Sequence, residues 1–297
     1  MKRCMQQRML ILLSLIWSSH LILVQQIGTF LPVLLTGAFV RMGTFVILTV
    51  ALICSHRFFG LRPKSKMEGV LLFCVGVLGF LLDYFSFLGL QNANSNVGSA
   101  LLKTDVFFSL FLGSFVFKTS RRLRLREYAA TVVMLIGVLL ILDIRPGAVH
   151  FHKTDLFFIA SSLCVTLNAF LIQHIQKKYA TKNDIIAFYN NLFTMLLFLA
   201  AHFCTQEPQI ALQRDPQLLL FIAAAGLTQA LIYLLYYRGL SIYPVWFIKT
   251  VLLLMPVFSM FLNLLLFHAK PSLQHILGTV IVLTTAAYIL YTQKEFS

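Results

Sequence analysis

Long apolar stretches alternate with short polar breaks along almost the whole chain. A helix needs about 20 mostly apolar residues to cross the hydrocarbon core of a bilayer. The pattern therefore predicts an all-α membrane protein with ten transmembrane helices. We place them at residues 9–25, 31–54, 69–90, 97–117, 128–142, 156–175, 185–203, 217–237, 244–267 and 273–291, with the fifth and tenth short.

Composition excludes a soluble domain. Hydrophobic residues make up 59% of the 297 positions, charged residues only 11%, and the mean hydropathy is +0.85. Soluble domains carry about 25% charged residues. The N-terminus resembles a signal peptide, but no small-residue cleavage site follows its apolar run, so we expect a retained first span.

The net charge of +14 reflects membrane orientation. With the N-terminus in the cytoplasm, the cytoplasmic segments hold seventeen lysines and arginines and the opposite side holds four. Positive residues concentrate in cytoplasmic loops, so both termini are predicted to be cytoplasmic. The same distribution argues against a nucleic-acid partner. The predicted location is the plasma membrane, which is the inner membrane in a Gram-negative bacterium, with the chain in contact with the lipid bilayer.

The longest non-cytoplasmic connection in the middle, residues 143–155, divides the chain into five spans and five spans. We therefore predict two repeats, at residues 1–147 and 148–297. An odd number of spans in each half gives the halves opposite orientations, which is the inverted-repeat plan of many secondary transporters. The stretch from Ala100 to Thr104 is also similar to the stretch from Phe247 to Thr250.

Five ionisable side chains lie inside the predicted spans: Arg41, Asp83, Lys103, Asp105 and Lys249. Each charge at the bilayer centre costs roughly 2.5–3.5 kcal/mol on insertion scales. Two interpretations stay open. The charges pair with one another, as Lys103 with Asp83, and only fix helix packing, or they line a polar cavity through which a compound passes. Lys249 lies in the first turns of its span, from where a lysine can also reach the interface.

Uncharged polar residues within spans extend the set: Trp17, His20, Asn168, Tyr189, Asn190, Asn191 and Gln229. Taken singly, such a side chain more often hydrogen-bonds a neighbouring helix than a ligand. We select as candidate substrate-binding residues Trp17, His20, Arg41, Asp83, Lys103, Asp105, Asn168, Tyr189, Gln229 and Lys249.

The chain contains no sequence motif for metal binding, cofactor binding or a common enzyme class. The five cysteines show no metal-ligand spacing, which predicts no metal and no cofactor. No P-loop, GxSxG or HExxH motif is present, so an ATP-driven pump and the common hydrolases are excluded. A membrane enzyme would need a catalytic cluster of carboxylates or histidines that the sequence does not show.

Several local patterns resemble the drug/metabolite transporter superfamily, specifically its EamA-like branch. They are Trp17-Ser18-Ser19-His20 in the first span, Pro32 followed by Arg41 in the second, the turn from Phe87 through Asn94 to Ala100, and Met255-Pro256-Val257-Phe258 in the ninth. The proline expected in the fourth span is absent, and so are the acidic residues expected after the fourth and ninth. The resemblance implies ten helices in two five-helix halves, with the polar residues facing a central cavity.

Together these features predict a secondary transporter, not an enzyme, that moves a small polar metabolite such as an amino acid or related compound by alternating access. The charged candidates carry three positive and two negative charges, which favours a substrate with an anionic group, while Asp83 and Asp105 would suit an amine. Protons or a counter-substrate would supply the energy. One alternative is exchange of S-adenosylmethionine-like or nucleotide-like metabolites; another is a non-transporting membrane subunit or lipid-translocation partner.

Overall fold

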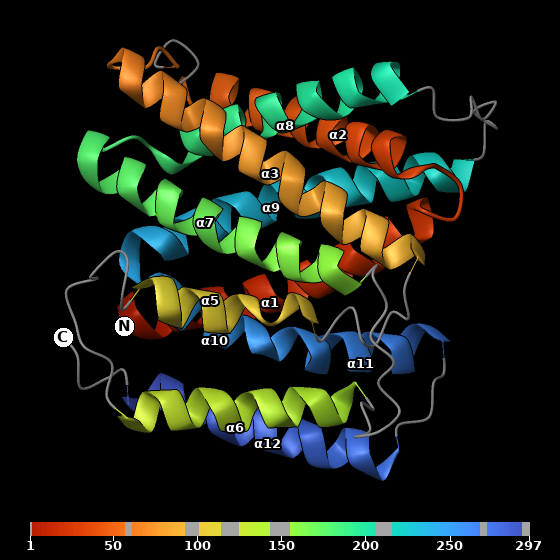
Figure 1. Cartoon of the computed structure of the whole chain (residues 1–297), viewed down its shortest axis with the longest axis vertical. Coiled ribbons are helices and arrows are strands. Elements are labelled where there is room, and N and C mark those ends of the chain that lie inside the picture. The colour runs from red at the N-terminus through yellow and green to blue at the C-terminus, as the bar shows by residue number, and fades with distance from the viewer. Residues whose placement is uncertain are drawn as a thin grey trace.

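A computed structural model describes residues 2–56, 61–92, 101–113, 125–142, 155–205, 216–267 and 272–292, and the regular elements in these ranges are helices (Figure 1). They are α1 (Lys2–Ile27), α2 (Val33–Cys54), α3 (Lys66–Asn92), α5 (Asp105–Phe111), α6 (Leu125–Ile141), α7 (Asp155–Tyr179), α8 (Asn183–Thr205), α9 (Pro216–Ile242), α10 (Val245–Val251), the 3₁₀ turn η3 (Leu252–Leu254), α11 (Met255–Phe267) and α12 (Leu273–Thr292).

Eight segments of the described chain are long and apolar enough to cross a membrane, with α10, η3 and the start of α11 forming one of them. They coincide with eight of the ten predicted spans. The other two predicted spans fall on α5, whose seven residues form only part of 97–117, and on α6, which has 17 residues. Residues 97–100 and 114–117 of the predicted fourth span lie outside the described residues, as do most of the 143–155 connection and the turn at 94–100. The chain is a multi-pass membrane protein, and the count of ten helices stays a prediction.

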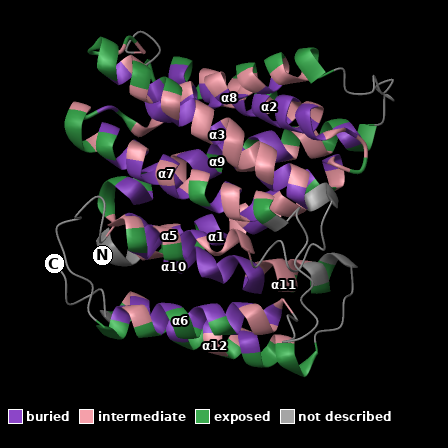
Figure 2. Ribbon diagram, viewed as in Figure 1, coloured by how far each residue is buried: buried purple, intermediate pink, exposed green. Residues whose placement is uncertain are grey.

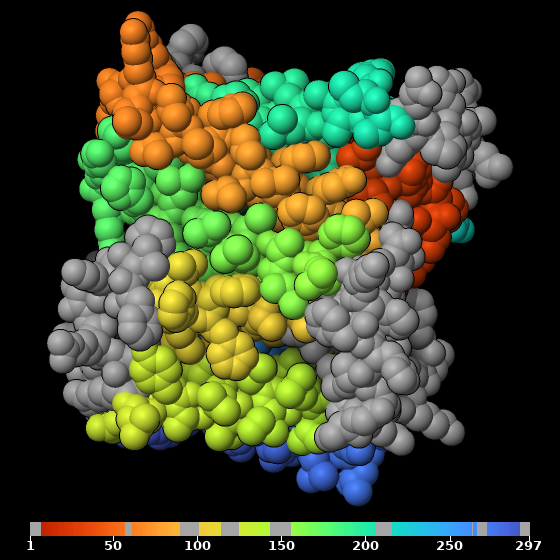
Figure 3. All heavy atoms as spheres, in the orientation of Figure 1, coloured from red at the N-terminus to blue at the C-terminus, as the bar shows by residue number. Residues whose placement is uncertain are grey.

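The helices run roughly parallel and are stacked along the long axis, with α8 and α2 at one end and α6 and α12 at the other (Figure 1). One face of the molecule is formed by α3, α7, α5 and α6 in that order (Figure 3). Buried residues occupy the inner surfaces of the helices, and exposed residues gather at their ends and outer faces (Figure 2). Large apolar side chains such as Val133 and Leu277 are among the exposed ones, as expected where lipid covers the helices.

Each helix of the first half corresponds to a helix of the second half, and corresponding helices make corresponding contacts when the two halves are exchanged. α3 packs against α7 as α1 packs against α9, and α3 packs against α8 as α2 packs against α9. The pairs α2 with α8 and α6 with α12 map onto themselves in this exchange. The packing therefore follows a two-repeat architecture in which each half completes the other.

Individual hydrogen bonds follow the same exchange. The Thr44 hydroxyl on α2 donates to the carbonyl of Gly226 on α9 at 3.3 Å, and the Thr194 hydroxyl on α8 donates to the carbonyl of Gly76 on α3 at 3.0 Å. Glycines at these crossings allow the backbones to approach, because a Cβ on Gly226 would lie only 2.9 Å from the carbonyl carbon of Gly43. These two crossings fix α2 and α3 against the central helices that carry the site.

The fourth and ninth spans are both irregular near their charged residues. Pro256 cannot donate a backbone hydrogen bond to the preceding turn, and the 3₁₀ turn η3 precedes it. Ser14 and Ser18 of α1 donate to the carbonyls of Val251 and Met255, at 3.4 and 2.9 Å. These bonds tie α1 to the backbone of the irregular segment, as neighbouring side chains commonly do where a helix is broken at membrane depth.

A matching arrangement holds the start of the described part of the fourth span. The Ser162 hydroxyl of α7 lies 3.0 and 2.9 Å from the carbonyls of Leu101 and Leu102, just before the turn that leads into α5. Thr166, one turn further along α7, donates to the carbonyl of Asp105 at 3.2 Å. Each irregular segment is thus held by hydroxyls of the first helix of the opposite half.

Candidate functional site

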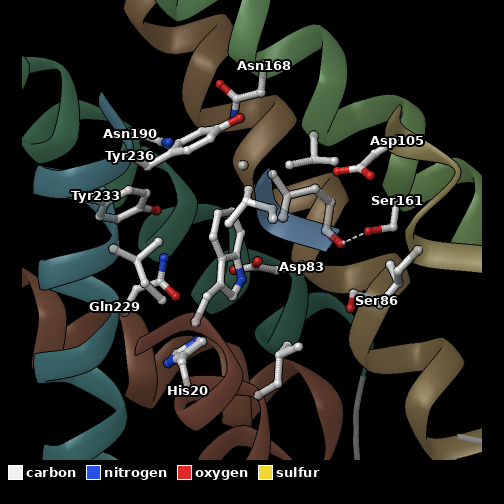
Figure 4. Close-up of a pocket in the computed structure, with 18 of the residues that line it drawn as sticks. His20, Asp83, Ser86, Asp105, Ser161, Asn168, Asn190, Gln229, Tyr233 and Tyr236 are labelled. Carbon is white, nitrogen blue, oxygen red and sulfur yellow. Dashed lines mark hydrogen bonds between the residues drawn. The ribbon is translucent and has the colours of Figure 1, made fainter. Parts of the chain in front are cut away.

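A cavity lies among the central helices. Its wall takes residues from α1, α2 and α3, from the segment around Lys103, and from α7, α8, α9, α10, η3 and α11. Figure 4 shows polar side chains converging on it, with Asp105 and Ser161 on one side and Gln229 and Tyr233 on the other. Both halves of the chain therefore contribute polar side chains to a single cavity inside the bundle.

Arg41 and Asp83 form an ion pair between α2 and α3. The Nε and Nη2 atoms of Arg41 both donate to Oδ2 of Asp83, the former at 2.9 Å. The two side chains are 3% and 14% exposed. Nη1 of Arg41 has no hydrogen-bond partner among the described residues, and the guanidinium lies 5.1 Å from the ring centre of Tyr233. The pair neutralises both charges while leaving part of the guanidinium available.

A second ion pair joins the two irregular segments. Nζ of Lys249 lies 3.0 Å from Oδ2 of Asp105, and the lysine side chain is only 1% exposed. Lys249 therefore points into the protein and does not extend to the membrane interface. Its ammonium group also lies 5.4 Å from the ring centre of Tyr236, which adds a cation–π contact. This pair connects α10 of the second half with α5 of the first.

The other four charges pair, but Lys103 does not pair with Asp83, the partner suggested for it from the sequence. Its Nζ lies 3.2 Å from the sulfur of Met255. Both carboxylates of the cavity wall are engaged by other cations, Asp83 by Arg41 and Asp105 by Lys249. Among the described residues Lys103 therefore has no carboxylate within ion-pair distance, unlike the other two cations of the site.

Neutral polar and aromatic groups complete the wall. The His20 Nδ1 lies 3.0 Å from the hydroxyl of Thr228, and the Asn168 amide donates to the carbonyl of Val75 at 3.4 Å. The rings of Trp17 and Tyr236 meet edge to face with their centres 5.4 Å apart. A compound in this cavity would meet charge, hydrogen-bonding groups and aromatic surface at once.

The structure brings together nine of the ten candidate residues chosen from the sequence. The nine that line the cavity are Trp17, His20, Arg41, Asp83, Lys103, Asp105, Asn168, Gln229 and Lys249. Tyr189 is not on this wall, and its hydroxyl donates to the carbonyl of Leu61 at 2.7 Å. Substrate binding by the nine stays a prediction, and Tyr189 is placed where it fixes the segment before α3.

Several wall residues were missing from that choice. Tyr233, Tyr236 and Tyr237 of α9 line the cavity beside Asn190 of α8, whose amide donates to the Tyr237 hydroxyl. Aromatic residues in a membrane helix usually pack or face lipid, so the sequence alone does not mark these three as cavity residues. A usable signal exists, because they lie four, seven and eight positions after Gln229 and so share its helix face.

The two halves of the chain differ at the positions of the charged site residues. Arg41 precedes Thr44 by three positions, as Asn191 precedes Thr194, and the Asn191 amide donates to the Arg41 carbonyl at 2.9 Å. Asp83 likewise follows Gly76 by seven positions, as Tyr233 follows Gly226. The Arg41–Asp83 pair of the first half thus corresponds to an asparagine and a tyrosine in the second.

Comparisons with known proteins address the whole chain. The sequence model of the EamA-like transporter family matches twice in succession, at residues 8–143 and 152–291. A solved structure described only as "Crystal structure of protein" matches with a TM-score of 0.79 at 19% sequence identity, over 100% of this chain and 99% of that one. No curated protein matches the chain. At this identity the structural likeness supports the fold alone.

Proposed function

Because this chain belongs to the EamA-like transporter family, whose members are membrane transporters of small molecules and not enzymes, we propose that it is a secondary transporter working by alternating access. Its proposed substrate is a small polar metabolite, such as an amino acid or a related compound. The proposed moving parts are two inverted five-helix repeats, residues 1–147 and 148–297. Both termini lie in the cytoplasm in this proposal.

The observation that carries the proposal is the composition of the cavity wall. Five ionisable residues, with His20, Asn168 and Gln229, line one cavity among the central helices. Ionisable residues at membrane depth are costly and in transporters mark substrate and ion pathways. Apolar residues at the same positions would pack the bundle without that cost.

Alternating access requires contacts that close one end of the cavity and can be broken. Gln173 of α7 donates to the carbonyls of Leu240 and Tyr243 at 2.9 and 3.2 Å. Gln176, one turn further on, donates to the carbonyl of Tyr237 at 2.8 Å. These bonds tie α7 to the C-terminal part of α9, and we propose that they close the cavity on the side of the α7–α8 turn.

The proposed energy source is a proton gradient or a counter-substrate. Asp83 and Asp105 are the carboxylates of the cavity wall, and each already has a cation as its partner. A proton or an amine that binds either carboxylate would release that cation. Such exchange of partners is a way to couple substrate binding to an ion movement.

A second candidate is exchange of ring-containing metabolites, similar to nucleotides or to S-adenosylmethionine. The aromatic part of the wall favours it, since Trp17 and Tyr236 present ring faces and edges beside the charged residues. Stacking on such rings would bind a planar base. The candidates differ in substrate and share the same cavity.

The test is transport by the purified protein in lipid vesicles. Vesicles are loaded with a small-molecule extract of bacterial cells, and the compounds that leave are identified by mass spectrometry, with and without a pH gradient and with and without the extract outside. We expect a small set of polar metabolites to leave these vesicles faster than they leave loaded vesicles that contain no protein. Release that depends on external extract indicates exchange, and no release of any compound would favour a non-transporting membrane subunit.

The proposed topology predicts the results of reporter fusions. Alkaline phosphatase is active only outside the cytoplasm, so a fusion after residue 148 is expected to be active and a fusion after residue 180 inactive. A fluorescent protein that matures in the cytoplasm, placed at the same two positions, should give the opposite result. The reversed pattern in both reporters would refute the orientation, and activity at both positions would refute the helix count.

A further inference from the structure

The ionisable side chains on the cavity wall do not balance. Three are cationic, Arg41, Lys103 and Lys249, and two are carboxylates, Asp83 and Asp105. The wall formed by the described residues therefore carries an excess of one positive charge, apart from His20. The distances between the cations and the two carboxylates show which cation carries that excess.

Two of the three cations are already neutralised. Arg41 has both hydrogen bonds to Asp83, and Lys249 lies 3.0 Å from Asp105. Lys103 is two positions from Asp105, yet the Asp105 carboxylate lies within ion-pair distance of Lys249. Among the described residues, no carboxylate lies within 4.0 Å of the Lys103 ammonium group, so the excess charge belongs to Lys103.

The polar contact of Lys103 with Met255 does not compensate its charge. Its Nζ lies 3.2 Å from the thioether sulfur of Met255, which is a weak, uncharged acceptor. An ammonium group has three N–H donors, so at least two remain for another ligand. An unpaired cation at this depth is unfavourable unless something anionic joins it.

The Lys103 backbone is held in place on the cavity wall. The Ser162 hydroxyl bonds the carbonyls of Leu101 and Leu102 directly before it, and the Thr166 hydroxyl bonds the carbonyl of Asp105 two positions after it. The lysine therefore projects from a fixed segment, with its side chain lining the space that Asn168 and Tyr236 also face. An ammonium group carried by such a fixed backbone segment can recognise one group of a bound compound.

We propose that Lys103 is a substrate-binding residue, which holds an anionic group of the transported compound, either a carboxylate or a phosphate. This inference rests on the proposed transport function and specifies the chemistry of its substrate. Arg41 and Lys249 maintain the structure of the wall through their carboxylates, whereas Lys103 selects the substrate. The bound anion supplies the negative charge that the wall lacks.

The experiment compares variants in the vesicle assay with the extract of bacterial cells. Lys103→Gln is expected to slow the release of the anionic compounds that the wild-type protein transports by about 10- to 100-fold, the range for losing a hydrogen bond between charged partners. Lys103→Arg keeps the charge and should retain most of the transport with a changed KM. Lys177→Gln, the same change at an exposed position of α7, should behave as wild type.

Folding is followed in the same samples, because a structural role would appear there first. Removing Lys103 leaves Asp83 and Asp105 with their cation partners, so Lys103→Gln and Lys103→Met should keep the thermal stability of the wild type. Lys249→Gln leaves Asp105 without its partner and should lose stability. If both neutral Lys103 variants unfold while Lys103→Arg does not, the lysine charge is structural and the proposal is wrong.

The remaining outcomes separate the two levels of the proposal. Release of only neutral or cationic compounds by the wild type, or unchanged release of anions by folded Lys103→Gln, would leave transport standing and overturn the role of Lys103. Release of carboxylates or of phosphate esters identifies which anionic group is bound. Failure of the wild type to release any compound would instead refute the transport function.

Discussion

Replacing Arg41 with glutamine is expected to lower the free energy of unfolding by about 3–5 kcal/mol, because Asp83 is left as a buried carboxylate without a cation. The double variant Arg41→Gln/Asp83→Asn should recover most of this loss, since it removes both charges. Breaking one partner of a buried pair is costly, whereas replacing both is often close to neutral. Thermal unfolding in detergent, followed for the two single variants and the double variant, measures the coupling.

The same variants test whether Arg41 also binds substrate. Nη1 of Arg41 has no hydrogen-bond partner among the described residues, so a ligand could accept from it. Arg41→Lys keeps the charge but replaces a planar group that donates twice to Asp83, and it should lose part of the stability. Full transport by the stable double variant would restrict Arg41 to a structural role. If the double variant is no more stable than Arg41→Gln, Arg41 and Asp83 do not form the ion pair described above.

The second large effect is expected where α2 crosses α9. An alanine at Gly226 would place its Cβ 2.9 Å from the carbonyl carbon of Gly43 and 3.0 Å from the nitrogen of Thr44. Both neighbours are backbone atoms, so the helices must separate, and the Thr44 hydrogen bond to Gly226 would lengthen with them. We expect a loss of about 1–3 kcal/mol for Gly226→Ala, and more for Gly226→Leu.

Gly43 provides the matched control at the same crossing. A Cβ there would meet the nearest atoms of α9 at 3.5 Å, which is ordinary van der Waals contact. Gly43→Ala should therefore be neutral or stabilise the protein by up to about 1 kcal/mol through its higher helix propensity. Thermal stability and elution as a single species in detergent distinguish the two variants. Equal behaviour of the two alanine variants would show that this crossing is not packed as described.

The sequence determined the class of protein and the positions of eight of its predicted spans. Length and hydropathy suffice for this, because a segment in a bilayer must satisfy its backbone hydrogen bonds internally and must match the thickness of the hydrocarbon core. The ends of the predicted spans 31–54 and 273–291 accordingly agree with those of α2 (Val33–Cys54) and α12 (Leu273–Thr292) within two residues. Charged residues inside such segments are rare enough that composition alone directed attention to Arg41 and Asp83.

The partners of those charges were decided only by the tertiary structure. A position in one helix specifies a face relative to its own neighbours, and it does not specify which other helix that face will meet. Lys249 could have extended to the interface, yet the packing of α10 against α5 places it on Asp105. The partners of Lys103 and Tyr189 could not be read from the sequence either. The packing of their segments places Lys103 beside Met255 in the cavity and the Tyr189 hydroxyl on the carbonyl of Leu61.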